Sequence, residues 1–139
     1  MKQAAGRRRV ARLYAGLISL VTLVIIFQGF LFAGFYSEAD RDFLDAHGAV
    51  GFISMLVVAL VLTPLGFLAR FPKGLRIGWL TLLLALLWVV QGFSGEGIED
   101  DRTLAMVHIP LALVVFGLSL YLTGKAHLAL RGKSGRSSD

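Results

Sequence analysis

Hydrophobic residues dominate four segments of the chain, and short polar stretches separate these segments. The apolar segments cover roughly residues 13–36, 43–69, 75–94 and 104–124. Each is close to the ~20 residues that a helix needs to cross ~30 Å of hydrocarbon. No period-two alternation is present, and an open strand would leave backbone groups unpaired in lipid. The pattern therefore predicts an all-α integral membrane protein, an up-down bundle of four spanning helices.

Composition supports the membrane interpretation. The chain has 139 residues, the usual size of one domain, and 56% of them are hydrophobic. Its mean hydropathy is +0.74, and a soluble core of this size could not bury that much apolar surface. It contains no cysteine, which excludes disulfides, thiolate metal sites and covalent heme attachment. The first segment is too long for a signal peptide and lacks a cleavage site, so we expect it to be retained.

The charged residues predict the orientation of the spans. Basic residues precede the first segment, separate the second from the third, and follow the fourth. They are Lys2, Arg7, Arg8, Arg9, Arg12, Arg70, Lys73, Arg76, Lys125, Arg131, Lys133 and Arg136. The other connections hold only Arg41 and Arg102 as cations, among Glu38, Asp40, Asp42, Asp45, Glu96, Glu99, Asp100 and Asp101.

Because cytoplasmic loops carry the excess of Lys and Arg, both termini should be cytoplasmic in a plasma membrane. Residues 1–12 are then a basic N-terminus, 13–127 the bundle, and 128–139 a polar, disordered tail. The clustered charges serve as orientation signals that also contact anionic lipid. We expect no nucleic-acid partner.

One pattern occurs twice in the chain. The tripeptide Gln-Gly-Phe ends the first span at residues 28–30 and the third span at residues 91–93. An acidic connection follows each copy, and a histidine lies near the start of the next span, at His47 and at His108. The chain is therefore predicted to consist of two helical hairpins in the same orientation. Such parallel repeats are related by an axis along the membrane normal.

The paired histidines are the main candidates for chemistry, since ionisable residues inside spans are costly and often functional. Only His47 and His108 qualify, about one turn inside the outer ends of the second and fourth spans. These spans run in the same direction and are diagonal in an up-down bundle. Two imidazoles facing each other there could ligate one heme b, with both as metal ligands. The alternative is a pair of interfacial, hydrogen-bonded histidines.

Amides and small residues surround these positions. Gln28 and Gln91 lie at a similar depth and need partners in lipid, either a histidine or heme propionate or another helix. Arg41 and Arg102 could pair with propionates or with neighbouring acids. Small residues would leave room for a porphyrin or simply allow close helix packing. They are Gly48 and Gly51 beside His47, and Gly29, Gly34 and Gly92 near the outer span ends.

The half-repeat of Gln-Gly on one helix and His on the next resembles the heme-binding halves of heme A synthase. It is also similar to small four-helix membrane proteins of bacteria. In the synthase each half is a four-helix bundle with histidines on two helices, and one half holds a heme b. The resemblance covers roughly residues 20–125. This chain has one bundle and no deeper His or Glu, so the resemblance implies a heme site without synthase activity.

The leading hypothesis is a membrane b-type heme protein that serves electron transfer or heme handling near the outer face. A quinol, a redox partner protein or a larger membrane complex would then be needed to complete electron transfer. The first alternative is a heme-free accessory or scaffold subunit of a larger membrane complex. A small transporter is the remaining alternative, but the spans carry no buried carboxylate for coupling.

Overall fold

The computed structural model describes residues 2–38, 41–69, 71, 74–96 and 102–131, and all of their regular secondary structure is helical. The elements are α1 (Lys2–Glu38), α2 (Arg41–Val57), the π-helical turn η1 (Val58–Leu62), α3 (Thr63–Leu68), α4 (Gly74–Glu96), the 3-10 turn η2 (Arg102–Leu104) and α5 (Ala105–Arg131). Within the described residues there is no strand. The predicted all-α class is confirmed.

Four helical stretches are long and apolar enough to cross a membrane. They are Gly6–Gly34, Arg41–Leu68, Arg76–Glu96 and Ala105–Arg131. Each contains most of one predicted span, and large apolar side chains are exposed along all four, as lipid contact requires. The basic segment before the first span continues α1 as helix, because Lys and Arg are good helix formers. The final residues of the predicted tail, 132–139, lie outside the described residues.

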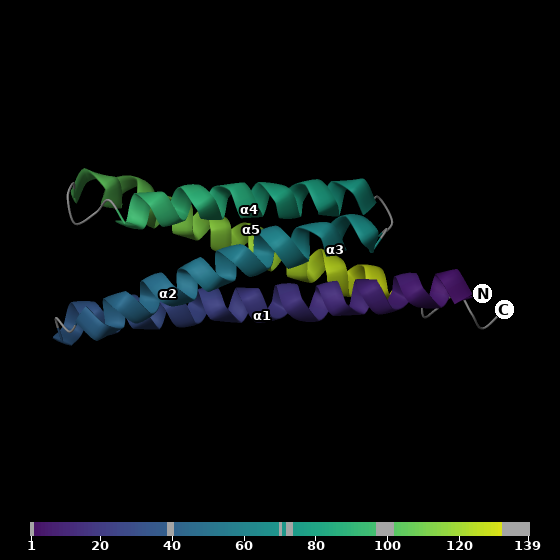
Figure 1. Cartoon of the computed structure of the whole chain (residues 1–139), viewed down its shortest axis with the longest axis horizontal. Helices are drawn as coiled ribbons and strands as arrows, with labels where there is room; N and C mark the ends of the chain where they lie inside the picture. Colours follow the sequence, from purple (N-terminus) through teal and green to yellow (C-terminus); the bar gives the residue numbers. More distant parts are fainter. Residues whose placement is uncertain (1, 39–40, 70, 72–73, 97–101, 132–139) are drawn as a thin grey trace.

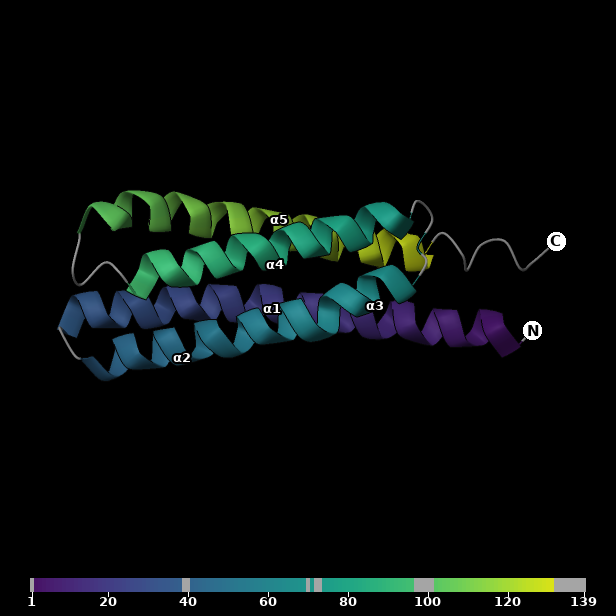
Figure 2. The ribbon, with the colours of Figure 1, turned by 45° about the horizontal axis from the view of Figure 1, so that its top comes forward.

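The helices form the predicted up-down bundle of two hairpins. The first hairpin is α1 followed by α2, η1 and α3, and the second is α4 followed by α5 (Figure 1). Helix α1 packs beside α2 and α5, and α4 packs beside α3 and α5, so α2 and α5 are diagonal. The start of α1 and the end of α5 lie at the same end of the bundle (Figure 2). We call this the basic end and the opposite one the acidic end.

Pro64 accounts for the irregular turn in the second span. Proline has no N–H to donate and its ring crowds the preceding turn of a helix. The chain widens at η1, where the backbone N–H and the hydroxyl of Thr63 both bond to the carbonyl of Val58. A π-helical turn of this kind is a common adjustment in membrane helices. In contrast, α5 stays continuous through Pro110.

The tightly packed core lies in the half of the bundle toward the basic end. Its fully buried side chains include Tyr14, Ile18, Leu62, Leu84 and Leu122. A buried hydrogen bond of 2.7 Å joins the Tyr14 hydroxyl of α1 to Thr81 Oγ1 of α4. Nearby, α3 and α4 approach closely, since a Cβ placed on Gly66 would lie 3.3 Å from the Gly78 Cα.

The half toward the acidic end is packed more loosely. No residue is buried in 23–34 of α1 or in 103–114 around the start of α5, and only Ser54 is buried in α2. Figure 1 shows the two hairpins diverging toward this end. The predicted site residues lie in this loosely packed half.

Candidate functional site

The two histidines of the repeat meet across the diagonal of the bundle. His47 is in the second turn of α2, and His108 is in the first turn of α5. Their ring centroids are 6.4 Å apart, with the ring planes inclined by 55°. Both side chains are half-buried. The structure therefore brings together the two residues that the sequence pattern singles out.

Each imidazole is held by the same hydrogen bond. His47 Nδ1 lies 3.0 Å from the main-chain oxygen of Gln28, and His108 Nδ1 lies 3.0 Å from that of Gln91. A carbonyl oxygen only accepts, so each Nδ1 carries the proton and donates. In the neutral rings Nε2 then keeps its lone pair, which is the arrangement found in metal-ligating histidines. Each copy of the repeat thus supplies one imidazole ring, and each ring has the same fixed tautomer.

The glutamines contribute to these bonds through the main chain and not through their amides. The amide nitrogen of Gln28 and the amide oxygen of Gln91 are buried without a hydrogen-bond partner among the described residues. Such groups are rare, because an unpaired buried polar atom costs about 1–3 kcal/mol. One donor and one acceptor near the two histidines are therefore left without a partner in the part of the chain that the structure describes.

The two rings differ in their other neighbours. The residue four positions after the glutamine is Phe32 in the first hairpin, and its ring centroid is 5.9 Å from that of His47. In the second hairpin that residue is Gly95, where an added Cβ would lie 2.8 Å from His108 Cε1. Ser94 also approaches His108, with its Oγ 3.2 Å from Nδ1 and donating to the Gln91 carbonyl.

Phe32, Ser94 and Gly95 are not among the site residues that the sequence predicts. The signal that could have found two of them is the register of the repeat. Phe32 and Gly95 both lie one helical turn beyond a glutamine, on the same helix face.

The glycines near the site fall into two groups. Gly29, Gly48 and Gly92 have no atom within 4 Å of an added Cβ, so close helix packing does not explain them. All three are exposed, on three different helices. Gly51 and Gly34 do face neighbours, since added Cβ atoms would lie 3.2 Å from the Gln28 amide nitrogen and 2.9 Å from the Phe43 ring respectively.

The ring-centroid separation of the histidines is compatible with one metal between them, provided that both Nε2 atoms face that space. An imidazole nitrogen binds a metal at about 2.0 Å and lies about 1.1 Å from its ring centre, so two opposed rings would have centroids about 6.2 Å apart. The observed separation is 6.4 Å. The described residues contain no group of three or more His, Cys, Asp or Glu that could hold a bare ion. A porphyrin supplies four nitrogens of its own, so two histidines suffice.

Of the remaining candidates, only Arg41 has a described side chain. Arg41 is exposed in the first turn of α2, and the side chain of Arg102 lies outside the described residues, as does the connection 97–101. His127 lies near the basic end, where its Nε2 is 3.0 Å from the Ser19 hydroxyl. Comparison of the chain with protein-family models, with curated proteins and with solved structures gives no match.

Proposed function

We propose that this protein binds one heme b between its two hairpins, near the acidic end, and serves electron transfer or heme handling. One observation carries the proposal. Two imidazoles from diagonal helices lie 6.4 Å apart, and each donates its Nδ1 proton to a main-chain carbonyl. His47 and His108 would be the two axial ligands. When bound, the heme supplies one-electron chemistry that no side chain of this protein has.

The surrounding residues suit this cofactor. The unsatisfied amides of Gln28 and Gln91 can donate to or accept from polar groups at the heme edge. Gly29, Gly48 and Gly92 place no side chain in the way of a flat macrocycle. The divergence of the hairpins allows both histidines to approach it from opposite faces. No other cluster of the described residues combines ligating nitrogens with partnerless polar atoms.

The placement of the charges adds an orientation to the proposal. Both termini would be cytoplasmic in the plasma membrane, because the basic residues gather at that end of the bundle. The heme would then lie near the outer face. One heme near one surface cannot carry electrons across the whole bilayer. A quinol, an extracytoplasmic redox protein or a larger membrane complex would have to be the partner.

Visible absorption spectroscopy tests the proposal. The purified protein would be compared, oxidised and dithionite-reduced, with His47→Ala, His108→Ala and His127→Ala. The third variant is the matched control, because His127 lies on the same helix as His108 but at the basic end. We expect a low-spin b-type spectrum in the wild type and in His127→Ala. We expect it to be lost or to become high-spin in the other two variants.

The opposite results favour a heme-free accessory or scaffold subunit of a larger complex. One such result is that the wild type takes up no heme when hemin is supplied during expression or reconstitution. The other is full heme retention in His47→Ala and His108→Ala. In either case the two histidines would be interfacial packing residues.

A further inference from the structure

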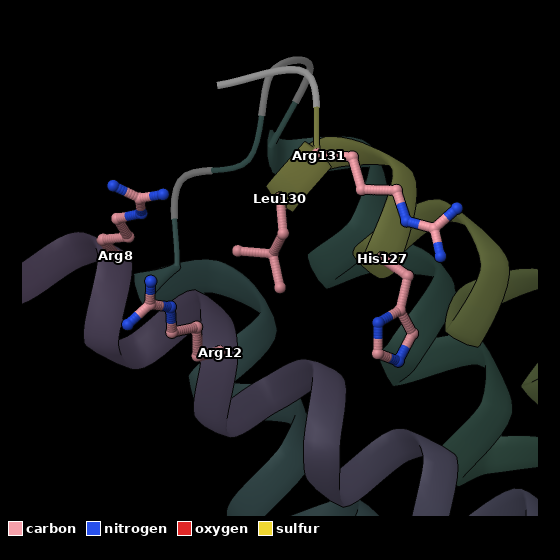
Figure 3. A pocket seen from close by; sticks show the side chains of 5 residues that line it. All are labelled: Arg8, Arg12, His127, Leu130 and Arg131. Atoms are coloured by element: carbon pink, nitrogen blue, oxygen red, sulfur yellow. The ribbon is translucent and has the colours of Figure 1, made fainter. Parts of the chain in front are cut away.

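A second site lies at the basic end, between the first and last helices. An open pocket of about 310 Å³ is lined by Arg8 and Arg12 of α1 and by His127, Leu130 and Arg131 of α5. Figure 3 shows the α1 residues and the α5 residues on opposite sides of the hollow, with the Leu130 side chain between them. Residues four apart share one helix face. Each helix therefore lines the pocket with one pair of nitrogen-bearing side chains, Arg8 with Arg12 and His127 with Arg131, and the guanidinium groups of Arg12 and Arg131 extend to opposite sides of the hollow (Figure 3).

The walls of the pocket are held together just below it. The Ser19 hydroxyl donates to the carbonyl of Ala15, 2.8 Å away, so it accepts the proton of His127 Nε2 at 3.0 Å. One turn deeper, the hydroxyls of Thr22 and Thr123 are 3.0 Å apart. These two contacts join α1 to α5 and make the pocket a feature of packed helices.

The positive charge of the arginines that line the pocket favours an anionic ligand. Apart from Asp139, every Asp and Glu of the sequence lies in residues 38–45 or 96–101, and the described helix ends that flank these connections are at the acidic end. The guanidinium groups of Arg12 and Arg131 therefore lie far from these carboxylates. Arginine binds phosphate with two parallel hydrogen bonds, which makes a phosphate group the best chemical match.

The surroundings favour a lipid as the source of the phosphate. Leu130 forms part of the pocket wall. Exposed leucines continue along the same two helices, with Leu13 54% exposed, Leu20 56% and Leu128 63%. In a membrane these side chains would meet acyl chains. The pocket volume of about 310 Å³ also falls within the range of about 300–1,000 Å³ found for small-ligand sites.

We propose that this pocket binds the phosphate headgroup of one anionic phospholipid, and that the exposed side chains of Arg12 and Arg131 turn inward to hold it with their guanidinium groups. The proposal is independent of heme binding, because the pocket and the histidine pair lie at opposite ends of the bundle. Binding of one lipid in a defined pocket differs from the general attraction of basic residues to acidic lipid. Arg7 and Arg9 are exposed on the same turns of α1 but do not line the pocket.

That difference provides a matched control. Short-chain phosphatidylglycerol would be titrated into the intact protein in neutral detergent, with complexes counted by native mass spectrometry. The double variant Arg12→Gln/Arg131→Gln would be compared with Arg7→Gln/Arg9→Gln, which loses the same charge. We expect one tightly bound lipid in the wild type, about tenfold weaker binding in the first variant, and a change below about twofold in the second.

Three results would overturn the proposal. They are equal losses in both variants, equal affinity for short-chain phosphatidylcholine, and displacement of the lipid by inorganic phosphate at similar concentration. The last would make a free phosphate the ligand. If Arg12→Gln/Arg131→Gln does not fold, Arg12→Lys/Arg131→Lys keeps the charge and removes the paired donors. We then expect several-fold weaker binding, and unchanged affinity would refute the role of the guanidinium groups.

Discussion

Gly95 of α4 lies directly against the imidazole of His108 of α5. A Cβ added to Gly95 would lie 2.8 Å from Cε1 and 3.1 Å from Nδ1 of that ring. The equivalent position in the first hairpin holds Phe32, whose ring packs 5.9 Å from His47 between centroids. The two histidines thus share one hydrogen-bond arrangement but have unlike neighbours, and His108 has less room to move.

The first prediction concerns Gly95→Ala. The added methyl group must displace the His108 ring, because contacts below 3.0 Å are not tolerated, and overpacking of this kind costs about 1–3 kcal/mol. The ring then shifts from the carbonyl of Gln91. We expect heme affinity to fall by about tenfold and the low-spin spectrum to weaken, measured by hemin titration.

Gly117→Ala is the control for this change. Gly117 lies on α5 outside the proposed heme site, and the substitution gains the same helix propensity, about 1 kcal/mol, yet its added Cβ meets nothing within 4 Å. We expect heme affinity within about twofold of wild type. Equal affinity for heme in Gly95→Ala and the wild type would show that the His108 ring position does not matter.

The second prediction concerns Gln91→Leu. The side-chain oxygen of Gln91 is buried without a partner, whereas the main-chain oxygen holds His108. The substitution removes the unsatisfied group and keeps the main-chain bond. We therefore expect the heme-free protein to be as stable as wild type or up to about 2 kcal/mol more stable.

The heme affinity of this variant should fall, whereas its stability stays equal or rises. If the amide contacts the heme edge, Gln91→Leu loses one hydrogen bond and the affinity falls by about tenfold. Chemical unfolding in mixed micelles and hemin titration measure the two quantities separately. A variant that is more stable and binds heme like the wild type would remove Gln91 from the proposed site.

The third prediction tests the packed half of the bundle through Tyr14→Phe. Thr81 Oγ1 donates to the carbonyl of Ile77 at 2.8 Å, so the Tyr14 hydroxyl is the donor in the 2.7 Å bond between them. Both side chains are fully buried. Loss of the hydroxyl should lower the free energy of unfolding by about 1 kcal/mol, measured by circular dichroism during denaturant titration.

Tyr121→Phe is the matched control for the tyrosine. Tyr121 is 42% exposed, and its ring still faces the Lys125 ammonium, 5.3 Å from the centroid, after loss of the hydroxyl. We expect a change below about 0.5 kcal/mol. Equal effects of the two substitutions would argue that the bond between Tyr14 and Thr81 adds nothing to stability.

The sequence alone determined the number of spans, the helical class, the hairpin order and the shared depth of His47 and His108. These properties depend on the length and spacing of apolar runs, which are local along the chain. A lipid environment leaves a helix as the only way to pair the backbone of each run. Pro64 and Pro110 both lack the backbone N–H of a regular helix, yet only the second span forms a π-helical turn, so this irregularity does not follow from the sequence alone.

Only the tertiary structure decided how the histidines are held. Every residue has a main-chain carbonyl, so nothing in the sequence indicates that those of Gln28 and Gln91 bind the two imidazoles. The contact of Gly95 with His108 and the pocket between Arg12 and Arg131 depend on how far each helix is rotated about its own axis. That rotation is set by side-chain packing between helices, which no local pattern of residues specifies.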